Sequence, residues 1–94
     1  MKIKLSKDEV LLKGEDMLGK PFPGEVTRRI DYLTENVLKE IAVNHNEWTR
    51  LYLDESDGRY WELFYPEYNE HDVGPPSLRN IPEAEVKEKY KLTA

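Results

Sequence analysis

The chain contains no cysteine, and this absence excludes several kinds of chemistry at once. Disulfide bonds, zinc–thiolate sites and thiol catalysis all need that side chain. Long apolar runs are missing as well: no segment approaches the roughly 20 apolar residues of a membrane span. Residues 1–5 also lack an apolar run of signal-peptide length. The sequence therefore predicts a cytoplasmic protein without a membrane partner.

Imidazole side chains are scarce too, because His45 and His71 are the only histidines. His45 lies in a polar segment, residues 44–46, and is most simply a surface turn residue. His71 stands between Glu70 and Asp72, but three consecutive residues rarely point at one ion, and no second spaced ligand pair supports a metal site. The serines lack the setting of a catalytic triad, and the glycines lack the spacing of a phosphate loop. We therefore expect no enzyme, no cofactor and no metal.

The length of 94 residues indicates a single domain over residues 1–94. Hydrophobic residues make up 38% of the chain and charged residues 35%, which is typical of a soluble globular protein and not of a disordered segment. A chain of this size can build one core and a shallow groove, but hardly a deep enclosed pocket. An enzyme, which would need a pocket holding a group of shifted pKa, is the least favoured class.

A helix is predicted over about residues 25–35. Apolar side chains recur there at the four-three-four spacing of one helical face, at Val26, Ile30, Leu33 and Val37. Charged side chains fall on the solvent side, at Arg28, Arg29, Asp31 and Glu35. A strand through the same residues is the alternative, and it fits less well because Arg28 would share the buried face.

Two further helix signals lie near the ends of the chain. Ser6 and Glu9 have the spacing of a capping box and Leu5 with Val10 that of a hydrophobic staple, which predicts a brief helix before Gly14. Near residues 82–90 a C-terminal helix is expected, with Pro82 in its first turn and an inner face of Val86 and Tyr90. Its surface is expected to carry two ion pairs four residues apart, Glu83–Lys87 and Glu85–Lys89.

Between the helices the sequence predicts strands. Residues 38–43 form a short apolar run, and residues 48–53 and 59–65 form a hairpin around a turn at 54–58 that ends in Asp57-Gly58. One face is expected to be core, with Leu51, Leu53, Trp61, Leu63 and Tyr65. The opposite face is mixed, either lightly covered or presented to a partner, with Tyr52, Tyr60, Glu62 and Phe64. The expected fold class is α+β: a small antiparallel sheet with a central hairpin at about 48–65, packed by the two longer helices.

Negative charge is concentrated in residues 47–72, which hold eight acidic residues against Arg50 and Arg59, while the whole chain has a net charge of −5. The same stretch contains both tryptophans and four of the six tyrosines. Its last part, residues 66–77, is rich in proline and is predicted to be an irregular loop, and long ordered loops in compact domains are usually functional or flexible.

Acidic surfaces repel nucleic acid and anionic lipid, so the ligand that this charge favours is a basic protein. Tyr and Trp are common anchors of protein interfaces. We therefore predict a partner-binding surface on the hairpin tip, the mixed face and the loop: Asp54, Glu55, Asp57, Glu62, Glu67, Tyr68, Glu70 and Asp72. The alternative is that these acids only keep a small protein soluble, as charge runs usually do.

The hairpin and its following loop carry a recognisable pattern. The block Gly58-Arg59-Tyr60-Trp61-Glu62-Leu63, followed by His71-Asp72-Val73-Gly74-Pro75-Pro76-Ser77-Leu78, resembles immunity protein family 27 of bacterial polymorphic toxin systems. Residues 29–36 and 39–43 are similar to the same family. In all, the resemblance covers about residues 5–90. One departure is the sequence after His71, where the family tends to have a run of glycines.

The resemblance implies a cytoplasmic antidote that binds a cognate toxin and blocks it without catalysis. A nuclease is one toxin class that would fit, because its cleft is basic where it holds phosphates. The alternative reading is a small acidic adaptor or structural module that binds another basic protein, and the identity of the neighbouring gene would separate the two.

Overall fold

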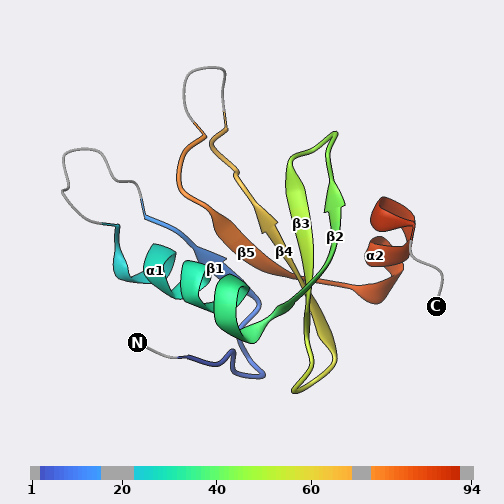
Figure 1. Ribbon diagram of the computed structural model, residues 1–94, viewed down its shortest axis with the longest axis horizontal. Helices are drawn as coiled ribbons and strands as arrows, with labels where there is room; N and C mark the ends of the chain where they lie inside the picture. The colour runs from blue at the N-terminus through green and yellow to red at the C-terminus, as the bar shows by residue number, and fades with distance from the viewer. Residues whose placement is uncertain (1–2, 16–22, 69–72, 92–94) are drawn as a thin grey trace.

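The computed structural model describes residues 3–15, 23–68 and 73–91 (Figure 1). A five-stranded antiparallel sheet in the order β1-β5-β4-β3-β2 forms the middle layer. In chain order the elements are β1 (Leu11–Lys13), α1 (Glu25–Tyr32), the π-helical turn η1 (Leu33–Val37), β2 (Lys39–Asn44), β3 (Thr49–Asp54), β4 (Arg59–Phe64), β5 (Ser77–Ile81) and α2 (Glu83–Tyr90). The α+β class, the central hairpin and the two longer helices were predicted from the sequence, and the structure confirms them.

Helix α1 covers one face of the sheet, as its apolar spacing predicts. Ile30 and Leu33 are fully buried, and Val26 and Val37 pack against the same core cluster. The helix starts at Glu25 and continues through η1, which closes with a hydrogen bond from the Leu38 N–H to the Leu33 carbonyl at 2.7 Å. The strand alternative for this segment is therefore wrong.

Arg29 departs from the predicted solvent side of α1. The residue is only 9% exposed, and its guanidinium donates hydrogen bonds to the Glu9 carboxylate at 2.6 and 2.7 Å and to the Lys4 carbonyl at 2.7 Å. These bonds hold the N-terminal segment against α1. They also hold the pKa of Glu9 at about 2, mainly through the hydrogen bond from Arg29, against an ordinary value of 4.5.

The brief N-terminal helix predicted before Gly14 is wrong. Ser6 and Glu9 form an isolated turn, in which the Ser6 N–H donates to Glu9 Oε1 at 2.8 Å and the Glu9 N–H donates to the Ser6 carbonyl at 3.1 Å. The bond from the Glu9 side chain to the Ser6 N–H, which is one of the two bonds of a capping box, is thus present, but no helix follows it. Val10 is 61% exposed, so no staple forms, and its carbonyl accepts from the Asn80 N–H as the chain enters β1.

Strand β5 was also missed, since Ser77 was assigned to the irregular loop and residues 78–81 were not predicted to be a strand. It lies between β1 and β4 in the sheet and pairs with both. Ser77, Leu78 and Ile81 are all buried, because both faces of this strand are covered. The strand depends on partners that are distant in the chain, and its own five residues lack a local pattern that would predict a strand.

The register of the β3–β4 hairpin corrects the predicted core face. Leu51 pairs with Glu62 and Tyr52 pairs with Trp61, so Leu51 and Trp61 point to opposite faces. Trp61, Leu63 and Tyr52 pack in the core cluster under α1. Leu51 packs instead under α2, together with Ile81 and Val86. The fold therefore has three layers, with the sheet between α1 and α2.

Helix α2 agrees with the prediction for residues 82–90, with Pro82 at its N-cap. Val86 is 1% exposed and Tyr90 packs against the same cluster. Of the two predicted surface pairs, Glu83–Lys87 is present at 3.6 Å, whereas Glu85 and Lys89 turn to residues of the sheet. Within the described parts of the chain, neither helix combines the length and apolar character that crossing a bilayer requires.

Candidate functional site

The hairpin tip uses one of its predicted contact residues to build its own turn. Asp54 is only 3% exposed, and its Oδ1 accepts hydrogen bonds from the Ser56 N–H at 3.0 Å and the Ser56 hydroxyl at 2.6 Å. The Gly58 N–H donates to the Asp54 carbonyl at 2.7 Å, and Gly58 has a φ of +78°, which glycine adopts without strain. The carboxylate of Asp54 is therefore turned inward, and the expectation that it faces a partner does not fit this geometry.

Two other tip acids remain at the surface. Glu55 is exposed, and the Asp57 carboxylate lies 2.7 Å from Arg59 Nε. Burial raises the pKa of Asp57, but its hydrogen bonds to the Arg59 backbone and side chain outweigh this and hold the pKa below its usual range. Arg59 also donates to the Ser6 and Glu9 carbonyls at 2.8 and 2.9 Å, which fastens the tip to the N-terminal segment.

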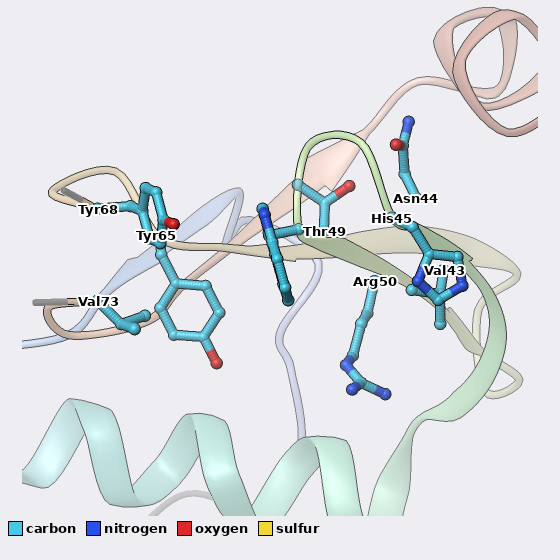
Figure 2. A pocket seen from close by; sticks show the side chains of 9 residues that line it. Val43, Asn44, His45, Thr49, Arg50, Tyr65, Tyr68 and Val73 are labelled. Atoms are coloured by element: carbon cyan, nitrogen blue, oxygen red, sulfur yellow. The ribbon is translucent and has the colours of Figure 1, made fainter. Parts of the chain in front are cut away.

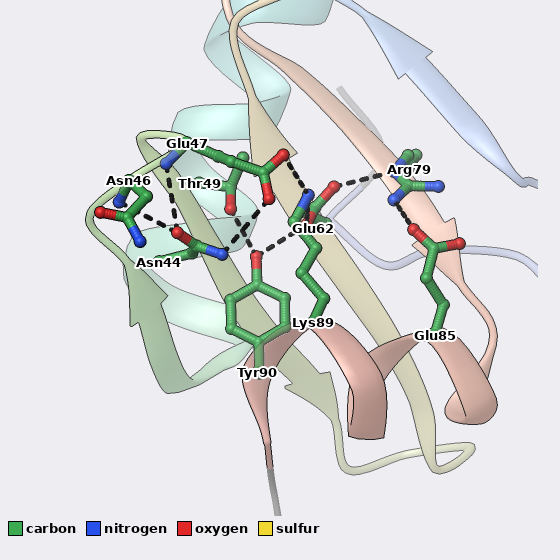
Figure 3. Close-up of polar contacts among 9 residues, drawn as sticks. All are labelled: Asn44, Asn46, Glu47, Thr49, Glu62, Arg79, Glu85, Lys89 and Tyr90. Atoms are coloured by element: carbon green, nitrogen blue, oxygen red, sulfur yellow. Dashed lines mark hydrogen bonds and ion pairs between the residues drawn. The ribbon is translucent and has the colours of Figure 1, made fainter.

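Glu62 lies inside the protein, not on a presented face. It is 1% exposed, and its carboxylate accepts from Arg79 at 2.9 Å, Lys89 at 2.8 Å and the Tyr90 hydroxyl at 2.7 Å (Figure 3). Burial raises the pKa of Glu62, yet the three donors together outweigh it and hold the pKa below its usual range. The sequence left open whether this mixed face is covered or presented, and at Glu62 helix α2 covers it.

The polar cluster around Glu62 connects α2 to three strands. The Tyr90 hydroxyl also bonds Thr49 Oγ1 at 2.7 Å, and burial raises the pKa of Tyr90 well above its ordinary value. Arg79 reaches Glu85 as well, and Lys89 lies 3.5 Å from Glu47. Figure 3 shows these side chains converging between α2 and the sheet. We call them the Glu62 cluster: Glu47, Thr49, Glu62, Arg79, Glu85, Lys89 and Tyr90.

The loop after β4 places two of its predicted contacts at the surface. Glu67 and Tyr68 are exposed, Tyr68 by 54%, and the Tyr68 N–H donates to the Tyr65 carbonyl in a turn. Glu70 and Asp72 lie outside the described residues, as does His71. The part of the prediction that concerns these three residues stays a prediction.

The hairpin tip and this loop lie at opposite ends of the sheet (Figure 1). The tip joins Asp54 to Arg59, whereas the loop leaves β4 at the other end, next to the start of β3. The six predicted residues that the structure describes therefore do not form one continuous surface. Glu55 and Asp57 belong to one end, Glu67 and Tyr68 to the other, and Asp54 and Glu62 are buried.

The loop end of the sheet carries a hollow of about 590 Å³. The β2–β3 turn forms one side and the chain after β4 the other, so that Tyr65, Tyr68 and Val73 face His45, Asn44 and Val43 across it (Figure 2). Trp48 lines it too and is 68% exposed. We call this feature the aromatic hollow, lined by Val43, Asn44, His45, Trp48, Thr49, Arg50, Tyr65, Tyr68 and Val73.

Trp48 reaches the aromatic hollow from a strained backbone position. Asn44 Oδ1 accepts hydrogen bonds from the N–H groups of Asn46 and Glu47 at 3.0 and 3.1 Å, which shapes the β2–β3 turn. The turn then returns to β3 through Trp48, whose φ is +58°. A bulky side chain in this left-handed region is uncommon, and such strain is concentrated at functional positions.

An acidic groove, lined by Glu47, Glu85, Glu88 and Lys89, lies on the α2 side of the sheet. The aromatic hollow lies on the α1 side, because Arg50 pairs with Leu63 of the core cluster under α1. The two features meet at the β2–β3 turn, where Glu47 immediately precedes Trp48. Arg50, the cation of the aromatic hollow, is paired with Glu40 at 2.8 Å. This end of the molecule thus combines exposed aromatic side chains with acidic ones, of which Glu85 is paired with Arg79 and Glu47 with Lys89.

Trp48 is the residue that the sequence analysis missed, because it was assigned to the first strand of the hairpin. The polar segment 44–46 before it was a signal for a turn, but the length of that turn was not predictable. His45 does lie in this turn and is exposed, as predicted. Across the described segments, no group of three or more His, Asp or Glu side chains is placed to hold a metal ion.

Comparison with known proteins supplies one match. A family model described as immunity protein 27 matches residues 22–82, which is more than half of the chain. No curated protein and no solved structure matches the chain.

Proposed function

Because the chain belongs to the immunity protein 27 family, we propose that it binds a cognate toxin and neutralises it by covering a surface that the toxin needs. The match over residues 22–82 carries this proposal, since it spans α1, η1 and β2 to β5. The protein then acts by occupying a surface and catalyses no reaction. Cytoplasmic action and membership of a polymorphic toxin system are parts of the same proposal.

The net charge of −5 supports a basic toxin. A nuclease is the class that fits best, because its cleft attracts phosphate and would attract carboxylates in the same way. Complementary fields can raise association rates toward roughly 10⁸–10⁹ M⁻¹s⁻¹, whereas neutral docking proceeds at about 10⁵–10⁶ M⁻¹s⁻¹. Fields of this kind act before contact, so the acids need not all lie in one interface.

The positions of the acids divide their proposed roles. Glu67 and Tyr68 lie at the end with the aromatic hollow and are proposed as direct contacts, and Glu70 and Asp72 remain predicted contacts. Glu55 and Asp57, at the opposite end, would contribute to the long-range field. A standard interface of about 800 Å² per partner can be supplied from one end of a molecule whose total exposed surface is 6591 Å².

Co-expression with the toxin encoded beside the chain is the direct test. Growth should be restored, and a catalytically inactive toxin variant should form a complex with the chain that calorimetry detects. If growth stays arrested while both proteins are soluble, the antidote proposal is wrong and the adaptor alternative gains weight.

The steering role has its own test. Glu55→Lys combined with Asp57→Lys should slow association with the inactive toxin and flatten its salt dependence while leaving dissociation nearly unchanged. An association rate equal to that of the wild type would show that the tip acids do not steer.

A further inference from the structure

We infer that the aromatic hollow and the acidic groove together form the toxin-docking site. Their occupant would be a protruding loop of a basic toxin, which inserts one apolar or aromatic side chain beside Trp48 and Tyr68. Lysine or arginine residues of the same loop would reach over the β2–β3 turn into the acidic groove on the α2 side. This inference rests on the proposed function and adds to it the site and the chemistry of the partner.

Exposure is the first argument. Trp48, Tyr68 and Val73 are 68%, 54% and 46% exposed, and all three line one hollow. Single exposed apolar side chains are ordinary on a protein surface, but several around one concavity are typical of an interface. Trp, Tyr and Arg are also the residue types enriched among interface hot spots, and the aromatic hollow contains all three.

The shape favours a protein loop over a small molecule. Small-molecule sites enclose most of their ligand and bury 70–90% of its surface. Here Trp48, which lines the aromatic hollow, remains more than two-thirds exposed, so the hollow does not enclose its own lining side chains. A partner that covers the rim as well as the hollow would bury Trp48 and Tyr68 together.

Charge identifies the partner as basic. The acidic groove is lined by Glu47, Glu85 and Glu88 and by the cation Lys89, and Glu85 also pairs with Arg79. Lys89 forms an ion pair with the buried Glu62 carboxylate at 2.8 Å, so its positive charge already compensates that carboxylate (Figure 3). Together with Glu62, these carboxylates still outnumber Arg79 and Lys89. Cationic side chains of a partner would therefore meet excess negative charge across the β2–β3 turn from the aromatic contacts, which would orient the partner on this end of the molecule.

The backbone of Trp48 is the fourth argument. A glycine or asparagine would adopt the φ of +58° with less strain than tryptophan does. The indole also gains little from burial within this chain, because it is 68% exposed. Neither backbone geometry nor core packing accounts for tryptophan at this position, whereas contact with a partner does.

The test measures binding of variants to the inactive cognate toxin. Trp48→Gly and Tyr68→Ala should each weaken affinity at least tenfold, mainly through faster dissociation. Trp48→Gly should at the same time unfold at a temperature equal to or above that of the wild type, which separates lost contact from lost stability. Leu11→Ala is the matched control, because Leu11 is 54% exposed on the far edge strand β1 and should bind within twofold of the wild type.

Charge reversal separates contact from steering. Glu88→Lys should accelerate dissociation, whereas Glu55→Lys at the opposite end should change only the association rate. A second readout uses the two tryptophans of the chain, labelled with 5-fluorotryptophan. The ¹⁹F resonance of Trp48 should shift on complex formation, while that of buried Trp61 should move little.

The outcomes distinguish the two proposals. If the wild type binds the toxin but Trp48→Gly and Tyr68→Ala bind within twofold of it, the docking site lies elsewhere and the antidote function stands. A wild type that does not bind the toxin overturns both. Weakened binding in the Leu11→Ala control, equal to that of the hollow variants, would also overturn the assignment to this end of the molecule.

Discussion

The two faces of the sheet are each covered by a helix, but different interactions hold them. Under α1 the contacts are apolar, with Ile30, Leu33, Trp61 and Leu78 fully buried in one cluster. Under α2 the apolar cluster is small, and the buried Glu62 carboxylate binds three donors beside it. The face under α1 gains stability from apolar burial, which requires no particular geometry. The face under α2 is stable only while every charged group keeps its partner.

This difference has a consequence for function. Lys89 and Glu85 of the Glu62 cluster also line the acidic groove, and Thr49 lines the aromatic hollow. The polar face therefore positions the acidic groove and one residue of the aromatic hollow, while the apolar face supplies most of the core and carries Arg50 of the aromatic hollow. Variants that weaken one face without the other would show how far the two roles are separate.

The largest effect is expected from Ile30→Ala on the apolar face. Ile30 is fully buried, and truncation of such a side chain destabilises by about 2–5 kcal/mol because it removes apolar burial and leaves a cavity. Urea denaturation should show this loss. Asp31→Ala, on the exposed side of the same helix, is the control and should change stability by no more than about 0.5 kcal/mol. A loss below about 1 kcal/mol for Ile30→Ala would mean that α1 contributes less than its burial implies.

A smaller effect is expected from Glu62→Gln on the polar face. The amide keeps the shape but removes the charge that Arg79 and Lys89 share, and each of those cations retains a second acid, Glu85 and Glu47. We expect a loss of about 2 kcal/mol in the free energy of unfolding, within the range for unpairing buried polar groups. Glu67→Gln removes an equal charge from the exposed loop and should be nearly neutral. If both variants behave alike, the Glu62 cluster does not stabilise the fold.

The smallest effect is expected in the pH dependence of stability. Arg29 holds the pKa of Glu9 at about 2, below its ordinary 4.5, so the folded state favours the ionised carboxylate. This contribution is fully present above about pH 4.5 and is lost as the pH falls toward 2. Thermal unfolding temperatures should therefore decline over that window, and Glu9→Gln should make the decline shallower. Ile30→Ala should lower the whole curve in parallel, because apolar burial does not titrate; a changed slope in that variant would contradict the separation of the two effects.

The amino-acid sequence was sufficient for features that depend on near neighbours. The four-three-four spacing at Val26, Ile30, Leu33 and Val37 produces α1 because helical periodicity alone brings those side chains to one face. The hairpin and the C-terminal helix followed from turn residues and local patterning in the same way. Tyr68, which the sequence places in a polar loop as a predicted contact, is 54% exposed, whereas its contact with a partner stays a prediction.

Strand pairing over long distances was decided only by the tertiary structure. Strand β5 exists because β1 and β4 supply its hydrogen-bonding partners, and a shift of one residue in the hairpin register moved Leu51 and Trp61 to opposite faces. The same pairing turned Glu62 inward, where Arg79, Lys89 and Tyr90 from distant parts of the chain neutralise it. The sequence by itself determined the helices, the hairpin and the excess of negative charge. Which carboxylates are buried, and that Trp48 and Tyr68 line one hollow, depended on contacts between residues far apart in the chain, which local spacing does not encode.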